Sequence, residues 1–128
     1  MKEIVKTDKA PAAIGPYSQA VRVGKFLFTS GQIPIDPATG ELVAGSAEEQ
    51  AERALENLKN LIEASGYTMR DVVKTTVFAA SMEYFAAVNG VYARYFADNP
   101  PGRSFVAVKE LPRGALVEIE AVAWKSKK

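Results

Sequence analysis

Residues 46–66, SAEEQAERALENLKNLIEASG, form the stretch that most clearly indicates the fold class. Ser46 and Glu49 match a capping box, in which each side chain bonds a free backbone amide at the start of a helix. Apolar side chains then recur every three or four residues, which gives the helix one face for burial: Ala51, Ala54, Leu55, Leu58, Leu61 and Ile62. Gly66 is typical of the residue that ends a helix. We therefore predict an amphipathic helix that begins after Ser46 and ends near Gly66.

Strand patterns lie on both sides of this helix. The predicted strands span residues 2–7, 17–23, 26–30, 71–80, 103–109 and 116–124. Gly24-Lys25 reads as a tight hairpin between the second and third of them. A second helix is predicted over residues 82–97, with Gly90 inside it and the aromatic side chains buried: Phe85, Tyr92, Tyr95 and Phe96. The order βββαβαββ predicts one α+β domain over residues 1–128, a sheet with two helices on one face.

The last predicted strand has two different faces. One face suits a core beneath the helices: Val117, Ile119, Ala121 and Ala123. The other face mixes acids with large apolar groups: Leu116, Glu118, Glu120, Val122 and Trp124. A sheet surface that faces solvent is normally more polar than this. We therefore interpret this second face as one that an oligomer buries.

The composition limits the chemistry and the partners. The 128 residues include no histidine and no cysteine, and 16 Lys and Arg stand against 15 Asp and Glu, for a net charge of +1. Ser-His-Asp triads, thiol nucleophiles, disulfides and zinc sites of the usual Cys/His kind are excluded. The near-neutral charge argues against a dedicated nucleic-acid binder. Neither a targeting segment nor an apolar run of membrane-spanning length is present, so the sequence predicts a cytoplasmic protein without a membrane partner.

Two acids and one arginine are the strongest candidates for chemistry. Glu118 and Glu120 share a strand face about 7 Å apart. If the last two strands form a hairpin, Arg103 lies opposite residues 120–122 and near these acids. Such an arginine could bind a substrate carboxylate while one acid deprotonates a water. From spacing alone, an ordinary cross-strand ion pair is the more frequent explanation.

Residues near the first hairpin are further candidates for a pocket. Tyr17 follows the bend Ile14-Gly15-Pro16, which directs its ring either into a pocket or onto the edge of the core. Ser30 has no histidine to activate it, so it is not a hydrolase nucleophile. Gly31 either lets a ligand approach the backbone or simply ends a turn.

Five segments recur in the order and spacing of a known family. They are Ile14–Ala20 (IGPYSQA), Ser30–Pro34 (SGQIP), Val73–Phe78 (VKTTVF), Arg103–Val108 (RSFVAV) and Val117–Ala121 (VEIEA). Together they resemble the RidA/YjgF family of enamine/imine deaminases over nearly the whole chain. The resemblance implies chorismate-mutase-like α+β subunits in a homotrimer, with active sites between subunits. It also implies hydrolysis of short 2-imino acids, such as 2-iminobutanoate and 2-iminopropanoate, to 2-oxo acids and ammonia, without a metal or organic cofactor.

The resemblance also assigns roles to residues. Arg103 would clamp the substrate carboxylate, and Glu118 would orient the attacking water and help to move protons. Tyr17 would line the pocket and Ser30 would lie near the ligand. Gly31 would allow a close approach to the backbone.

Two positions depart from the family pattern. Phe105 stands where many members have cysteine, so a cysteine nucleophile is not available and the ring would narrow the substrate pocket. Gly102 replaces the usual alanine or serine before Arg103. Asn89 matches a frequent family asparagine whose role the sequence leaves open.

Other functions remain compatible with the sequence. One is a non-enzymatic trimer that holds small carboxylates or acts like a chaperone. Another is an endoribonuclease or translation inhibitor, a role attached to some relatives, although the charge of +1 and the lack of a basic and aromatic stripe count against it.

Overall fold

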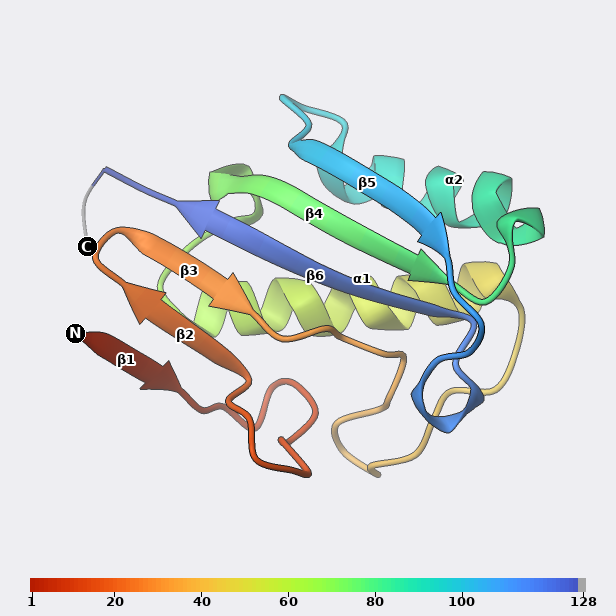
Figure 1. Ribbon diagram of the computed structural model, residues 1–128, viewed down its shortest axis with the longest axis horizontal. Coiled ribbons are helices and arrows are strands. Elements are labelled where there is room, and N and C mark those ends of the chain that lie inside the picture. The colour runs from red at the N-terminus through yellow and green to blue at the C-terminus, as the bar shows by residue number, and fades with distance from the viewer. Residues whose placement is uncertain (127–128) are drawn as a thin grey trace.

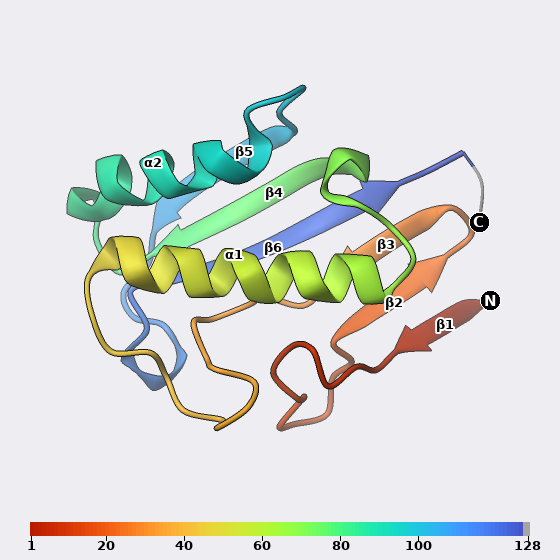
Figure 2. The same cartoon turned by 180° about the vertical axis from the view of Figure 1, so that it is seen from behind.

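The computed structural model describes residues 1–126 and has two layers, a six-stranded sheet and two helices packed against one of its faces (Figures 1 and 2). The strands are β1 (Lys2–Val5), β2 (Ala20–Val23), β3 (Phe26–Thr29), β4 (Val72–Ala79), β5 (Gly102–Ala107) and β6 (Val117–Trp124). The helices are α1 (Ala47–Ala64) and α2 (Phe85–Phe96), with short 3₁₀ helices at Met69–Asp71, Met82–Tyr84 and Pro112–Gly114. This confirms the predicted α+β class and the order βββαβαββ.

The sheet order is β1-β2-β3-β6-β4-β5, with β4 and β5 parallel and the other neighbours antiparallel (Figure 1). The predicted hairpin between the last two strands is therefore wrong. The chain passes from β4 through α2 to β5, and such a crossover places two strands parallel and side by side. After the turn at Pro112–Gly114, β6 returns on the far side of β4. Consequently β4 separates β5 from β6.

The start of α1 is confirmed to the residue. Ser46 Oγ accepts a hydrogen bond from the Glu49 amide at 3.2 Å, and the Ser46 amide donates to Glu49 Oε1 at 3.0 Å. The hydrogen bonds from Ser46 hold the pKa of Glu49 below its usual value. Gly66 follows the helix in the left-handed region at φ 91°, as expected of a residue that ends a helix.

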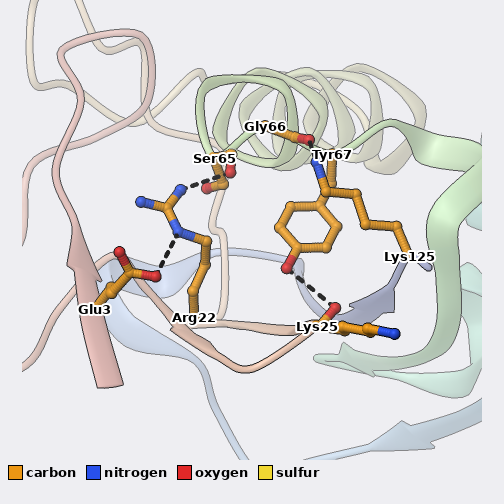
Figure 3. A network of polar contacts seen from close by, with 7 residues as sticks. All are labelled: Glu3, Arg22, Lys25, Ser65, Gly66, Tyr67 and Lys125. Atoms are coloured by element: carbon orange, nitrogen blue, oxygen red, sulfur yellow. Dashed lines mark hydrogen bonds and ion pairs between the residues drawn. The ribbon is translucent and has the colours of Figure 1, made fainter. Parts of the chain in front are cut away.

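The C-terminal end of α1 is held by a side chain of β2 and by the side chain that directly follows β6 (Figure 3). The last turn of the helix contains no basic residue of its own. Instead, Arg22 Nη1 donates to the Ser65 carbonyl at 2.6 Å, and the Lys125 ammonium donates to the Gly66 carbonyl. Cations are favourable at this end of a helix because its last carbonyls are unpaired and the helix dipole is negative there.

The core lies between the sheet and the apolar face of α1. Its fully buried side chains include Leu27, Leu55, Leu58, Leu61, Ile62, Val77, Val117 and Ile119. The buried Asn57 of α1 also donates to the carbonyls of Ile33 and Ile35, at 3.1 and 2.8 Å. These bonds fix the segment after β3 against the helix. Among residues 1–126, none of the helices is both long and apolar enough to cross a membrane.

Helix α2 is shorter than expected, because residues 82–84 form a 3₁₀ turn. Tyr92 and Phe96 are buried as predicted, but Phe85 is 37% exposed because it packs at the sheet edge against Phe105. An ideal Cβ at Gly90 would meet no atom within 4 Å, so close packing does not explain this glycine in the chain.

The face of the sheet away from the helices is called the outer face here. Alternation along β6 is confirmed, because Val117, Ile119 and Ala121 are buried while Glu118 and Glu120 point to the outer face. Leu116 was expected on the outer face, but it precedes the strand and packs against the core. Large apolar side chains of the outer face remain exposed: Ile4, Val23, Phe26, Phe28, Val106 and Trp124.

Candidate functional site

A cavity of about 770 Å³ opens beside the first half of β6. Its walls come from the loop before β2, from the segment after β3 and from the turn at Pro112–Gly114. Five of the residues selected from the sequence line it: Tyr17, Ser30, Gly31, Glu118 and Glu120. We call it the Glu118 cavity.

Gly31 makes room for the Glu118 carboxylate. An ideal Cβ on Gly31 would lie 1.9 Å from Glu118 Oε2 and 2.7 Å from its Cδ. The carboxylate therefore lies directly against the Gly31 backbone. Any residue with a Cβ at position 31 would clash with it. The resemblance implies that Gly31 lets a ligand approach the backbone. In this chain the Glu118 carboxylate fills the space next to Gly31.

An irregular pairing between β3 and β6 creates this contact. Phe28 pairs with Val122 while Gln32 pairs with Ile119, so four steps along one segment match three along the other. The extra residue behaves like a β-bulge, which changes where neighbouring side chains point. Thr29 Oγ1 accepts the Ala121 amide hydrogen at 3.0 Å within this irregular stretch.

The surroundings of Glu118 raise its pKa. Burial is the larger cause, because it penalises the charged form, and the neighbouring charge of Glu120 adds to it. A carboxyl with a raised pKa releases and regains a proton closer to neutral pH than an exposed one does. Glu118 therefore has the chemical character of an acid–base group.

Tyr17 and Ser30 are held by the same loop. The Tyr17 amide donates to the Gly15 carbonyl at 2.8 Å, and its ring is 51% exposed. Ser30 Oγ donates to the Ser18 carbonyl at 2.6 Å, which ties the end of β3 to this loop. The Ser30 oxygen keeps lone pairs for a ligand, but its proton is already committed to a backbone bond.

Gln19 anchors that loop, a role that no pattern in the sequence indicates. Its buried Oε1 accepts from the Thr7 amide at 2.8 Å, and its Nε2 donates to the carbonyls of Thr7, Ala10 and Pro11 at 3.0, 3.3 and 2.8 Å. The loop has no strand partner, so the hydrogen bonds of this one side chain hold its backbone in place. A glutamine in an irregular segment has no spacing pattern that reveals such bonds before the fold is known.

Arg103 and Phe105 lie on the other side of the sheet from Glu118. Arg103 pairs with Thr75 of β4, and Thr75 pairs with Ala121, whose side chain is buried under the helices. The side chain of Arg103 therefore points to the helix face. The expectation that Arg103 lies near the acids of β6 is wrong within one chain, because β4 separates the strands and the side chains point in opposite directions.

The half-buried guanidinium of Arg103 sits among residues of β5 and α2. Asn89 Oδ1 accepts from its Nη1 at 2.7 Å. Its Cζ lies 4.8 Å from the ring centre of Tyr92, 5.5 Å from Phe105 and 5.8 Å from Phe85. Within residues 1–126, no carboxylate forms an ion pair with Arg103. We call this arrangement the Arg103 seat, and it leaves most of the guanidinium N–H groups available to an anion.

Asn89 thereby acquires a role that the sequence had left open. Phe85, Asn89 and Tyr92 are four and three residues apart, which puts them on one side of α2. The spacing of these three residues can be read from the sequence. That β5 lies against this side of α2 cannot. Within residues 1–126, no group of three or more acidic side chains lies close enough together to hold a metal ion.

Comparison with known proteins identifies relatives over almost the whole chain. The family described as Endoribonuclease L-PSP matches residues 7–125. The mouse 2-iminobutanoate/2-iminopropanoate deaminase is 48% identical, over 96% of this chain and 91% of the mouse protein. A crystal structure from Thermotoga maritima superposes with a TM-score of 0.96 at 65% identity and covers 98% of both chains.

Two Escherichia coli structures show the same fold. TdcF with bound serine has a TM-score of 0.92 at 44% identity, over 97% of this chain and 99% of TdcF. The YjgF gene product has the same score and identity, over 96% of this chain and 98% of its own. The chain therefore belongs to the Endoribonuclease L-PSP family, which is the RidA/YjgF family that its five sequence segments resemble.

Proposed function

We propose that the protein hydrolyses short 2-imino acids, such as 2-iminobutanoate and 2-iminopropanoate, to 2-oxo acids and ammonia. The observation that carries the proposal is the Arg103 seat, a half-buried guanidinium that bonds the neutral amide of Asn89 and pairs with no carboxylate within residues 1–126. An arginine in this state binds a carboxylate through two parallel charged hydrogen bonds. The name of the mouse relative supports the choice of reaction.

The chemistry needs one clamp and one acid–base group. Arg103 would bind the substrate carboxylate, and ionised Glu118 would take a proton from the water that attacks the C=N carbon. The proton would then pass to the nitrogen, which gives a carbinolamine. Glu118 would next take the hydroxyl proton of the carbinolamine and deliver it to the nitrogen, so that the C=O bond forms, the C–N bond breaks, and ammonia leaves with the 2-oxo acid. The raised pKa of Glu118 favours this return of the proton. Phe105 would narrow the space beside the bound carboxylate.

The two groups would meet only between subunits. Because Arg103 and Glu118 point to opposite faces of the sheet, one chain does not offer both to one substrate. We propose a homotrimer in which the Arg103 seat of one subunit adjoins the Glu118 cavity of its neighbour. The exposed apolar side chains of the outer face, such as Phe28 at 45% and Trp124 at 41%, support burial of this face between subunits. Light scattering should then give a mass three times that of the 13.8-kDa chain.

The decisive experiment couples the protein to a threonine dehydratase and follows the release of ammonia and 2-oxobutanoate. The wild type should accelerate this release. Arg103→Ala should lower the protein-dependent rate roughly 100-fold without unfolding, because it removes a charged partner of the substrate. Arg70→Ala is the matched control, since Arg70 forms only an exposed ion pair with Asp98 at 3.0 Å. Equal release with and without the wild type would contradict the proposal.

Two observations support alternative functions, which the same experiment must distinguish from the proposed one. The serine bound to E. coli TdcF fits a protein that only holds small carboxylates, and binding of 2-oxobutanoate without any acceleration would favour that role. The family description names an endoribonuclease, although the net charge of +1 gives little attraction for phosphates. Ribonuclease activity that survives both Arg103→Ala and repeated purification would favour this second role.

A further inference from the structure

A buried hydrogen bond lies directly behind the Arg103 seat. The hydroxyls of Thr75 and Tyr92 are 2.7 Å apart, and the two residues are 0% and 6% exposed. Thr75 stands beside Arg103 in the register of β4 and β5, and the ring of Tyr92 lies 4.8 Å from the guanidinium carbon. Arg103 is therefore linked to Thr75 by strand pairing, Thr75 to Tyr92 by a hydrogen bond, and Tyr92 to Arg103 by the contact between ring and guanidinium.

Among the α2 side chains of the seat, Tyr92 is the one that is hydrogen-bonded to β4, the strand next to β5. Phe85 touches the guanidinium as a 37% exposed ring, and Asn89 accepts a hydrogen bond from a position at the helix surface. The Tyr92 ring is instead fixed at its far end by Thr75. A cation is held over an aromatic face by the electron density of the ring, so the place of the ring determines the place of the cation.

The alternative is that this bond only satisfies two buried hydroxyls. Buried polar groups need partners in any core, so the bond by itself does not show a link to Arg103. Tyr95 provides the comparison, because it lies on the same helix and its hydroxyl donates to Glu56 Oε2 at 2.7 Å. The contacts of the guanidinium include Tyr92 but not Tyr95. A comparison of the two tyrosines therefore distinguishes the loss of a half-buried tyrosine hydrogen bond elsewhere on α2 from the loss of the bond behind the Arg103 seat.

We propose that Tyr92 and Thr75 are positioning residues, whose mutual hydrogen bond holds the Tyr92 ring under Arg103 and so fixes the direction in which the guanidinium meets a carboxylate. The inference rests on the proposed function, because it assigns these residues to the carboxylate clamp of the same site. Burial raises the pKa of the Tyr92 hydroxyl, so it stays neutral and the ring acts as a fixed apolar support.

The first test compares Tyr92→Phe and Thr75→Val with Tyr95→Phe. Each variant removes one hydroxyl and keeps the shape of the side chain. For Tyr92→Phe and Thr75→Val we expect the KM for 2-iminobutanoate and the Kd of 2-oxobutanoate to rise about three- to tenfold, as loss of one hydrogen bond predicts, with kcat nearly unchanged. Tyr95→Phe should leave both constants at wild-type values. An unchanged KM and Kd in Tyr92→Phe, or an equal rise in Tyr95→Phe, would overturn the proposal.

The second test does not depend on turnover. In ¹⁵N-labelled protein the Arg103 Nε–H signal, assigned by its loss in Arg103→Lys, should be shifted by the ring current of Tyr92. Tyr92→Phe and Thr75→Val should move or broaden this signal, and Tyr95→Phe should not. A signal that stays in place in all three variants would refute the positioning role. If the wild type has no deaminase activity while this signal behaves as expected, the proposed reaction fails and the positioning pair stands.

Discussion

Replacement of Gly31 by alanine should separate catalysis from stability. An ideal Cβ at this position lies 1.9 Å from Glu118 Oε2, whereas real Cβ atoms essentially never come within 3.0 Å of a neighbour, so the carboxylate must retreat by at least 1.1 Å. Gly31 has no positive φ, so the alanine backbone is not strained. The clashing atoms belong to the end of a long side chain, which can rotate away. We therefore expect a loss of stability of only about 1 kcal/mol.

The loss of activity should be far larger. A misplacement of about 1 Å costs a reaction on the order of 100-fold, so kcat/KM for 2-iminobutanoate should fall by about that factor in Gly31→Ala. Ammonia release measures the rate, and thermal unfolding by circular dichroism measures the stability. Gly90→Ala is the control, because a Cβ there meets nothing within 4 Å, and it should raise stability by about 1 kcal/mol. A Gly31→Ala protein with wild-type kcat/KM, or one that does not fold, would refute the reasoning.

Three further outcomes follow from the same structure. Ser46→Ala removes the cap of α1 and should lower the free energy of unfolding by about 0.5–2 kcal/mol in urea titrations. Arg22→Met removes the bond to the helix end at Ser65 and the ion pair with Glu3, and it should lower the free energy of unfolding by about 1–2 kcal/mol. Because the pKa of Glu118 is raised in the folded chain, the folded state binds its proton more tightly. The contribution of Glu118 to the free energy of unfolding should therefore fall as pH rises from about 4.3 to the raised pKa of the folded state and then level off, and Glu118→Gln should remove this change.

The parts of the fold that depend on neighbouring residues were predictable. The capping box and the apolar face of α1 involve residues within a few turns of each other, so the sequence alone located the helix. The strand pairing joins residues far apart in the sequence. The turn at Pro112–Gly114 resembled the turn of a hairpin, which led to the wrong pairing of β5 with β6. The unit β4–α2–β5 contained the correcting signal, because a strand, a helix and a strand in succession favour parallel neighbours.

The sequence singled out several residues that the fold brings to one cavity, but it did not predict their geometry. Tyr17, Ser30, Gly31 and Glu118 line one cavity, although they are separated by up to about a hundred positions. The contact between Gly31 and Glu118 depends on one extra residue in the pairing of β3 with β6, which no local pattern reveals. The position of Arg103 depended on the order of the strands, so an error in one pairing moved it to the wrong face.

The separation of Arg103 from Glu118 shows how a chain without histidine or cysteine could support the proposed hydrolysis. Had the two formed a hairpin pair, the arginine would lower the pKa of the carboxyl, and each charge would be neutralised by the other. Within one chain the sheet lies between them, so Arg103 keeps its charge for a carboxylate, while burial and Glu120 raise the pKa of Glu118. In the proposed trimer, a substrate that bridges two subunits would neutralise Arg103 as it binds, so the pKa of Glu118 would stay raised at the moment when a proton must move. An imine carbon is already electrophilic, so this pair of groups needs no nucleophilic side chain.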